Sequence, residues 1–284
     1  MEIKAYAKVN LALKIVGIDP IDGYHKLEMV NVPISLCDDI FIEIDNSLSD
    51  HRITCNIKEV PLDSRNLVYK AIILLKEKYG FEDKFNIHIE KKIPIGGGLA
   101  GGSSNAASVI IGINKMLNLE KELEKLDDVA FKVGADVPYC LHMAPSIVKG
   151  KGEELEKFNI DENYYLLLIK GKKGLSTKDV YKKFDEKKIS SHLIDCEKLK
   201  KALIDGDEEL INRYMGNDLE IPAFEFNKEV QLIKERLIEF GLKNTMMTGS
   251  GACVFSLSKE KEILEKAKSL FNENDYFIAI VSII

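Results

Sequence analysis

Residues 93–108 read Ile-Pro-Ile-Gly-Gly-Gly-Leu-Ala-Gly-Gly-Ser-Ser-Asn-Ala-Ala-Ser, and this glycine-rich stretch decides how the chain is interpreted. It places five glycines between residues 96 and 102 and continues directly into an alanine-rich apolar segment. Glycine lets the backbone adopt positive φ angles and approach a ligand closely, because it has no Cβ atom. The pattern therefore predicts a flexible loop that opens into a helix.

The residues after the glycines indicate what this loop binds. Ser103 and Ser104 lie where a helix N-cap is expected, and a helix of this kind presents unpaired N–H groups and a positive dipole end. Both features favour a phosphate group, although a glycine cluster can also be an ordinary surface loop. The loop is not a Walker A loop, because Gly102 is followed by a serine and not by a lysine. We predict that residues 96–104 bind a phosphate.

A dinucleotide-binding loop is a second alternative, since the G-x-G-x-x-G spacing is present at Gly96, Gly98 and Gly101. The context argues against it. Residues 85–90 alternate apolar and polar side chains, as a half-exposed antiparallel strand does. A dinucleotide unit needs a buried parallel strand before the loop and another strand soon after the helix, whereas residues 122–133 are predicted to be helical. We reject this alternative.

Composition limits the class of protein. The 284 residues are enough for one large or two ordinary domains. With 46 acidic and 40 basic residues the formal net charge is −6, which argues against a nucleic-acid partner. The first residues lack the apolar core of a signal peptide, and no apolar run approaches the roughly 18 residues of a membrane span. We expect a cytoplasmic protein with no membrane partner.

Cysteines and histidines show no metal-ligand spacing, so no protein-bound metal is predicted. The cysteines are scattered and contain no C-x-x-C pair, which indicates reduced and mostly buried thiols. They are Cys37, Cys55, Cys140, Cys196 and Cys253. The histidines are His25, His51, His88, His142 and His192.

The N-terminal segment 2–15 alternates strictly and predicts a long, half-buried strand. Apolar residues occupy one face, and Lys8 and Asn10 lie on the opposite, polar face. From periodicity alone, these two residues are expected to be solvated.

The rest of the chain alternates between predicted strands and helices, which indicates an α+β protein with two layers in each half. Strands are predicted at 24–32, 39–45, 52–57, 85–91, 139–142, 164–169, 252–257 and 276–283. Helices are predicted from Asn66 to Gly80, after the glycine loop, and at 122–133, 176–184, 196–205, 207–215, 227–240 and 263–271. The charged segment 149–157 is the expected domain boundary, which gives domains 1–157 and 158–284.

Gly134-Ala135-Asp136-Val137-Pro138 lies at a predicted helix-to-strand corner. Gly134 is a plausible helix C-cap, and the residue before a proline disfavours the helical conformation. Asp136 is therefore expected to be held where it can present a carboxylate. The simpler alternative is an aspartate that bonds only to its own turn.

Taken together, these stretches resemble the GHMP kinase superfamily and, within it, the kinases of 4-diphosphocytidyl-2-C-methyl-D-erythritol. The resemblance covers nearly the whole chain, and its blocks occur in the expected order. They are Ala7-Lys8-Val9-Asn10-Leu11, Gly23-Tyr24-His25, Pro94 to Ala107, Gly134 to Pro138, and Thr248-Gly249-Ser250-Gly251.

This resemblance implies a two-domain fold, an activity and a set of site residues. The N-terminal domain would be ribosomal-protein-S5-like and the C-terminal domain ferredoxin-like, with the active site in the cleft between them. Asp136 would be the general base, Lys8 would hold that carboxylate ionised and offset phosphoryl charge, and Asn10 would bind the substrate or orient Lys8. ATP would be the co-substrate and would carry Mg²⁺. The ATP-binding residues would be Pro94, Ile95, Gly96, Gly97, Gly98, Leu99, Ala100, Gly101, Gly102, Ser103 and Ser104.

The same resemblance implies how the cytidyl substrate is bound. Tyr24 and Tyr181 would sandwich the cytosine ring, which suits offset stacking on a flat base. His25 would read the polar edge of the base, and Thr177 would be a further substrate contact. Gly249, Ser250 and Gly251 would form the third glycine motif. Without the resemblance, Tyr181 is better explained as a core aromatic residue.

Two other functions remain open from the sequence. The chain could be another GHMP small-molecule kinase, of the homoserine or mevalonate-pathway type, although Gly23-Tyr24-His25 argues against this. It could also be a non-catalytic nucleotide-binding module, against which the presence of both Lys8 and Asp136 speaks. The expected partners are ATP and a small-molecule alcohol, and a monomer or weak homodimer is expected.

Overall fold

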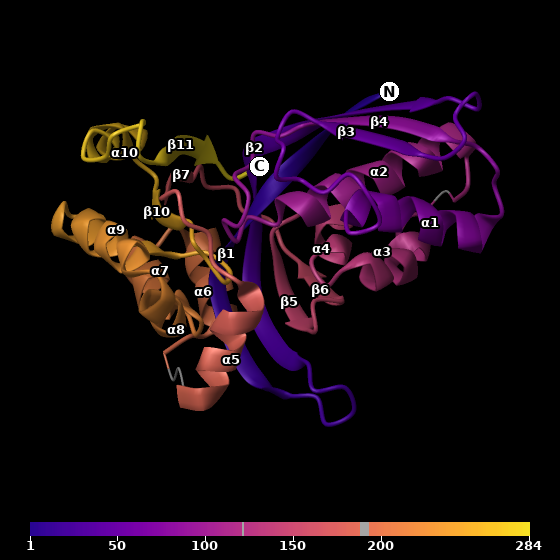
Figure 1. Ribbon diagram of the computed structural model, residues 1–284. Coiled ribbons are helices and arrows are strands. Elements are labelled where there is room, and N and C mark those ends of the chain that lie inside the picture. The colour runs from indigo at the N-terminus through magenta and orange to yellow at the C-terminus, as the bar shows by residue number, and fades with distance from the viewer. Residues whose placement is uncertain (121, 188–192) are drawn as a thin grey trace. The chain divides into compact units, whose positions relative to one another are not determined.

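The computed structural model describes residues 1–120, 122–187 and 193–284, which form two compact units (Figure 1). Each unit is assembled from separate segments of the chain. Unit 1 contains Met1–Ala7, Leu36–Ile93 and Ala100–Met143. Unit 2 contains Lys8–Ser35, Pro94–Leu99 and Ala144–Ile284. The domain boundary predicted after residue 157 stays a prediction.

Strands and helices are intermixed along the chain, as predicted for an α+β protein. The strands are β1 (Glu2–Ile18), β2 (His25–Ile44), β3 (Arg52–Cys55), β4 (Phe85–Glu90), β5 (Ser146–Gly150), β6 (Glu154–Lys157), β7 (Tyr165–Lys170), β8 (Gly216–Asn217), β9 (Thr245–Met247), β10 (Val254–Ser258) and β11 (Phe277–Ser282). The helices are α1 (Leu67–Tyr79), α2 (Gly101–Leu117), the 3-10 helix η1 (Leu123–Leu126), α3 (Asp127–Val133), α4 (Val137–His142), α5 (Thr177–Lys187), α6 (Cys196–Asp205), α7 (Glu208–Tyr214), α8 (Glu220–Phe226), α9 (Lys228–Glu239) and α10 (Lys261–Lys268). No helix in these described ranges is both long and apolar enough to cross a bilayer.

Unit 1 contains helices α1 to α4, which pack against one another, and a mixed sheet against which α2 packs (Figure 1). Residues 39–44 of β2 pair antiparallel with β4, and β3 pairs parallel with the other edge of β4. Helix α2 approaches the strands closely at Gly112, where a Cβ atom would lie 2.5 Å from Ile42 Cδ1 and 2.9 Å from Ile3 Cδ1. The glycine therefore sets how deeply α2, which follows the glycine-rich loop, is seated.

Unit 2 contains an antiparallel sheet in the order β11-β7-β10-β9, which contacts helices α9 and α10. Strand β7 has a neighbour on each side, and residues 166–169 are fully buried, which explains its unbroken apolar sequence. The first half of β2 pairs with β5, β5 pairs with β6, and β1 pairs with β8 at Ala12 and Gly216.

Most predicted elements are confirmed, with small differences at their ends. Helix α1 shows why. The Asn66 side chain accepts a hydrogen bond of 2.9 Å from the Val68 N–H group, and Gly80 ends the helix in the left-handed conformation at φ 70°. The strand predicted at 85–91 is also confirmed as β4.

The segment after Asp136 differs from its prediction. Residues 139–142 were expected to form a short strand, but they belong to helix α4. Pro138 lies in the first turn of α4, where a missing N–H group costs no intrahelical hydrogen bond. Asp136 therefore precedes a helix.

The expected serine cap of α2 is also wrong. The helix begins before both serines, at Gly101, and is preceded by Ala100 in the left-handed conformation at φ 56°. Ser104 lies within the first turn, and its hydroxyl donates to the Tyr6 carbonyl at 2.6 Å. The serine is thus used to fasten α2 to β1 within unit 1.

Several elements were missed or divided by the prediction. The segments predicted at 24–32 and 39–45 form one continuous strand, β2. Strands β5 and β6 and helix α8 were not predicted, because each is short and has weak periodicity. The predicted helix at 122–133 is divided into η1 and α3.

All five cysteines are free thiols. Cys140, Cys196 and Cys253 are buried, whereas Cys37 and Cys55 are partly exposed. Burial raises the pKa of both Cys196 and Cys253 to about 12, so these two thiols are held in their unreactive neutral form.

Candidate active site

The glycine-rich loop of unit 2, defined as residues 94–99, lies backbone to backbone against the third glycine motif. The Ala252 N–H group donates to the Gly96 carbonyl at 3.0 Å, and the Cys253 N–H group donates to the Gly97 carbonyl at 3.2 Å. A Cβ atom at Gly98 would lie only 2.2 Å from the Thr248 carbonyl oxygen. The two glycine-rich segments therefore pack against each other through their backbones. The sequence indicated this only through the glycine content of both segments.

Lys8 and Asn10 join this structure from strand β1. They are 3% and 0% exposed, so the solvated polar face predicted for this strand is wrong at these positions. The Lys8 Nζ atom donates to Asn10 Oδ1 at 2.7 Å, and the Lys8 N–H group donates to the Leu99 carbonyl at 3.2 Å. The Asn10 N–H group donates to Thr248 Oγ1 at 3.0 Å. Strand β1 is thus joined to the glycine-rich loop at Lys8 and to the third glycine motif at Asn10, and Asn10 also holds the Lys8 ammonium.

Two buried asparagines, not predicted from the sequence, support this arrangement. Asn10 Nδ2 donates to Asn31 Oδ1 at 2.6 Å on strand β2. Asn217 Nδ2 donates to the carbonyls of Met247 and Gly249, both at 2.8 Å. A polar amide inside an apolar strand is the sequence signal that could have identified Asn31, because a buried amide requires partners.

In unit 1, a buried carboxylate fastens the residues on both sides of the loop. Asp38 is 0% exposed and accepts from the N–H groups of Lys92 at 2.7 Å and Ile93 at 2.8 Å. It also accepts from Asn105 Nδ2 at 2.7 Å and forms an ion pair of 2.5 Å with Lys91. Asp38 therefore connects the chain entering the loop to the first turns of α2.

Asp136 lies at the start of α4 in unit 1 and is half-buried. Its carbonyl accepts from the Cys140 N–H group at 3.1 Å, which closes the first turn of the helix. Burial raises the pKa of the neighbouring Tyr139 phenol well above its usual value, and the charges of Cys140 and Asp136 add to this effect. Asp136 thus lies beside a phenol that stays protonated.

The residues expected to bind the cytosine ring belong to unit 2. The rings of His25 and Tyr181 have their centroids 4.8 Å apart, and His25 Nε2 lies 2.8 Å from Asp185 Oδ1. Thr177 Oγ1 and Ser250 Oγ are 2.7 Å apart, which connects the start of α5 to the third glycine motif. Tyr24 is 64% exposed.

The turn that carries Tyr24 is held by ion pairs. The Lys151 ammonium lies 3.1 Å from Asp19, also pairs with Asp22, and lies 6.0 Å from the centre of the Tyr24 ring. Hydrogen bonds from the Ile21 N–H group and Lys151 lower the pKa of Asp19, so its carboxylate stays charged.

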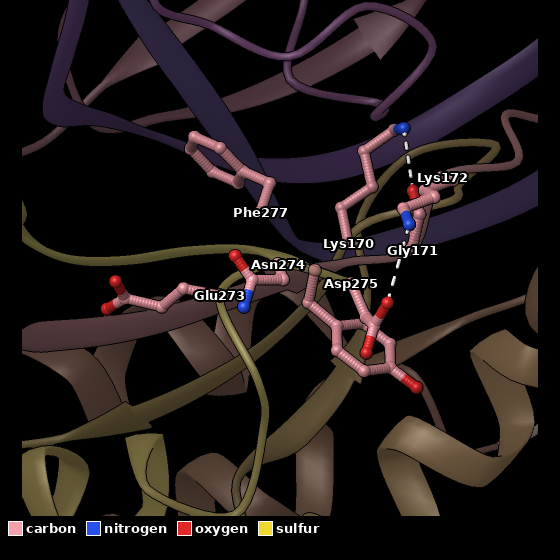
Figure 2. A pocket seen from close by; sticks show the side chains of 8 residues that line it. Lys170, Gly171, Lys172, Glu273, Asn274, Asp275 and Phe277 are labelled. Carbon is pink, nitrogen blue, oxygen red and sulfur yellow. Dashed lines mark hydrogen bonds and ion pairs between the residues drawn. The ribbon is translucent and has the colours of Figure 1, made fainter.

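A pocket opens beside the C-terminal end of β7, and Figure 2 shows the side chains that line it. Its volume is about 290 Å³. Lys170 is 7% exposed, and its Nζ atom donates to the Gly171 carbonyl at 3.0 Å. Burial lowers the pKa of this ammonium. Its Cδ atom would lie 3.5 Å from a Cβ atom at Gly97, so a buried lysine missed by the sequence analysis packs against the glycine-rich loop.

Among the described residues, no three His, Cys, Asp or Glu side chains gather as a metal site would require. His192 lies outside the residues that the structure describes.

Comparison with known proteins identifies the family. The family model of the GHMP kinase N-terminal domain matches residues 66–143, and that of the GHMP kinase C-terminal domain matches residues 199–275. A 4-diphosphocytidyl-2-C-methyl-D-erythritol kinase of Clostridium tetani is 39% identical over 277 residues, which cover 96% of this chain and 98% of that protein. The kinase of the same name from Clostridium beijerinckii is 40% identical over 257 residues, or 90% of each chain. This chain belongs to the 4-diphosphocytidyl-2-C-methyl-D-erythritol kinase family.

Solved structures agree with this family. A crystal structure of 4-(cytidine 5'-diphospho)-2C-methyl-D-erythritol kinase matches with a TM-score of 0.80 at 28% identity, covering 99% of both chains. A homoserine kinase of Cytophaga hutchinsonii matches with a TM-score of 0.74 at 20% identity, which shows a shared fold. The predicted two-domain GHMP kinase fold is confirmed, and the chain is a kinase.

The contact between the two glycine-rich segments of this kinase gives a stability prediction. Gly98→Ala should lower the free energy of unfolding by about 2–5 kcal/mol, because the new methyl group collides with the Thr248 carbonyl and the backbone is left-handed, at φ 73°. Urea denaturation measures this change.

Gly80→Ala is the matched control for Gly98→Ala. It has nearly the same backbone conformation, at φ 70°, but no atom lies within 4 Å of the added methyl group. It should therefore cost only the left-handed strain, about 1–2 kcal/mol. Equal losses in the two variants would contradict the close contact.

Proposed function

We propose that this kinase transfers the γ-phosphoryl group of ATP to the 2-hydroxyl of 4-diphosphocytidyl-2-C-methyl-D-erythritol, in non-mevalonate isoprenoid synthesis. The observation that carries the proposal is the buried Lys8, whose ammonium is held by Asn10 on a strand that is hydrogen-bonded to both glycine-rich segments. Phosphoryl transfer needs positioning and charge stabilisation more than covalent chemistry, and this arrangement supplies both. The identity of the proposed substrate is taken from the names of the relatives reported above.

Residues 94–104 are proposed to bind the ATP phosphates, with Mg²⁺ carried by the nucleotide. Gly101 begins a helix of 17 residues, whose first N–H groups and dipole favour an anion. Glycines at this point allow phosphate oxygens to approach the backbone N–H groups without meeting side chains.

Asp136 is proposed as the general base that removes the proton from the attacking hydroxyl, and Lys8 as the electrostatic partner of the reaction. A carboxylate is a suitable base here because the hydroxyl loses its proton only as the new bond to phosphorus forms. The Lys8 ammonium offsets the negative charge on the transferred phosphoryl group. Asn10 is proposed to hold Lys8, as their 2.7 Å hydrogen bond supports.

Tyr24, Tyr181, His25 and Thr177 are proposed to bind the cytidyl part of the substrate. The tilted contact between the rings of His25 and Tyr181 supports a polar and an aromatic group acting on the same base. Ser250, which lies 2.7 Å from Thr177, would connect this group to Gly249 and Gly251.

ADP release tests the proposed reaction directly. The purified chain is supplied with ATP and Mg²⁺, together with diphosphocytidyl methylerythritol, mevalonate or homoserine. Turnover with the cytidyl substrate alone is the expected result. Turnover only with mevalonate or homoserine would place the chain among the other GHMP kinases, and ATP binding without turnover on any alcohol would indicate a non-catalytic module.

Substitution of Tyr24 tests the proposed cytosine stacking. Tyr24→Ala should raise KM for the cytidyl substrate by roughly 5- to 100-fold, because base–aromatic stacking contributes about 1–3 kcal/mol per base. The KM for ATP should hardly change. Tyr24→Phe keeps the ring and should behave like the wild type, whereas equal effects of Tyr24→Ala on both substrates would argue against stacking.

A further inference from the structure

His25 packs against one face of helix α5 in unit 2. Tyr181, Phe184 and Asp185 have the i, i+3 and i+4 spacing that places side chains on the same helical face. The His25 ring packs against Tyr181 in a tilted arrangement, with ring centroids 4.8 Å apart, and against Phe184 in a T-shaped arrangement at 6.3 Å. Two aromatic contacts and one polar contact therefore determine how this imidazole is oriented.

The polar contact determines which ring nitrogen of neutral His25 carries the proton. His25 Nε2 lies 2.8 Å from Asp185 Oδ1. An ionised carboxylate can only accept hydrogen bonds, so Nε2 must be the donor. In a neutral imidazole the other nitrogen then has a free lone pair, and Nδ1 is a hydrogen-bond acceptor.

The Nδ1 atom is available for a ligand. Within the described ranges of the chain, Asp185 is the one hydrogen-bond partner of the His25 ring. The His25 side chain is 15% exposed, so most of the ring is covered while part of it reaches the surface. The contacts with Tyr181, Phe184 and Asp185 together fix the plane of the ring, which gives the Nδ1 lone pair a defined direction.

We infer that Asp185 is a positioning residue that makes His25 Nδ1 an acceptor and thereby selects a pyrimidine with an exocyclic amino group. Cytosine presents an amino donor at position 4, whereas uracil presents a carbonyl acceptor there. Two acceptors facing each other leave both groups without a hydrogen bond, and this disfavours uracil. The inference deepens the proposed function and rests on its assignment of His25 to the cytosine edge.

The first experiment reads the tautomer without any ligand. In the ¹⁵N-labelled full chain, a long-range ¹H–¹⁵N spectrum shows whether Nδ1 or Nε2 of neutral His25 is protonated, with the signals assigned by comparison with His25→Gln. Protonated Nε2 and unprotonated Nδ1 are expected. Protonated Nδ1 in the wild-type chain would overturn the inference, whatever the protein phosphorylates.

The second experiment measures base selection by titrating the full chain with CDP and with UDP. The wild type should bind CDP more tightly by roughly 10- to 100-fold, the range expected when a buried polar group loses its partner. Asp185→Lys should reduce or reverse this ratio, because an ammonium can only donate and makes Nε2 an acceptor. Asp185→Glu keeps the acceptor and should restore the preference for CDP.

Glu186→Lys is the matched control for Asp185→Lys. It makes the same change of charge one residue further along α5, where Glu186 pairs with Lys183. It should alter the binding of both diphosphates equally and leave their ratio unchanged. An unchanged ratio in Asp185→Lys would overturn the inference while the kinase assignment stands. If the wild type bound neither CDP nor UDP, the proposed cytidyl site would be wrong, and the inferred selection between the two bases would be wrong with it.

Discussion

Asp136→Asn is expected to lower kcat by about 10²–10⁴-fold, the contribution typical of a general base. The amide has nearly the same shape as the carboxylate but cannot take a proton from the attacking hydroxyl. The start of α4 should remain intact, because its first turn is closed by the Asp136 carbonyl and not by the side chain. ATP binding, measured by direct titration, should therefore stay close to that of the wild type.

Asp128→Asn is the control for this substitution. Asp128 is a carboxylate of the preceding helix, α3, and it forms a surface ion pair with Lys78 at 2.6 Å. Its replacement should leave kcat unchanged and reduce stability only slightly, since surface ion pairs contribute little. If Asp136→Asn turned over at the wild-type rate, Asp136 could not be the base.

Lys8→Met is expected to lower kcat by about 10²–10³-fold, as loss of one preorganised electrostatic group does in other active sites. Methionine keeps most of the length and apolar volume of the buried lysine stem. It removes the ammonium that lies 2.7 Å from Asn10 Oδ1. Because this charge acts on the transferred phosphoryl group, the effect should fall mainly on kcat.

Lys4→Met provides the comparison, because Lys4 lies on the same face of β1 but has an exposed side chain. It should leave kcat unchanged. Urea denaturation of Lys8→Met separates lost catalysis from lost folding. A variant that is folded and turns over at the wild-type rate would remove Lys8 from the reaction.

The sequence predicted elements well where local chemistry determines them. Asn66 and Gly80 terminate α1 through their own conformations, and the continuous apolar run of β7 agrees with a strand paired on both sides. The prediction of secondary structure was wrong where two local signals competed. A proline disfavours the helical conformation in the residue before it, but a proline is tolerated in the first turn of a helix. Pro138 lies in the first turn of α4, so the second effect decides the structure here.

The site could be predicted only in part, for a physical reason. The motifs singled out Lys8 and Asn10, but periodicity placed them in solvent. Their burial depends on partners far away in sequence, because Asn10 bonds to Thr248 across 238 residues. Asp38 and Asp185 belong to no motif, and only the folded chain shows that one fastens the loop and the other orients His25.

The hydrogen bonds from Ala252 and Cys253 to Gly96 and Gly97 also bear on the order of events during synthesis. The glycine-rich stretch leaves the ribosome long before the segment that holds it in place. Contacts between such distant segments form late, because the intervening chain must first be ordered. A nascent chain ending before residue 252 therefore carries the whole glycine-rich loop but lacks the N–H groups that bond to Gly96 and Gly97, and ATP binding is expected only after residues 252 and 253 have been made.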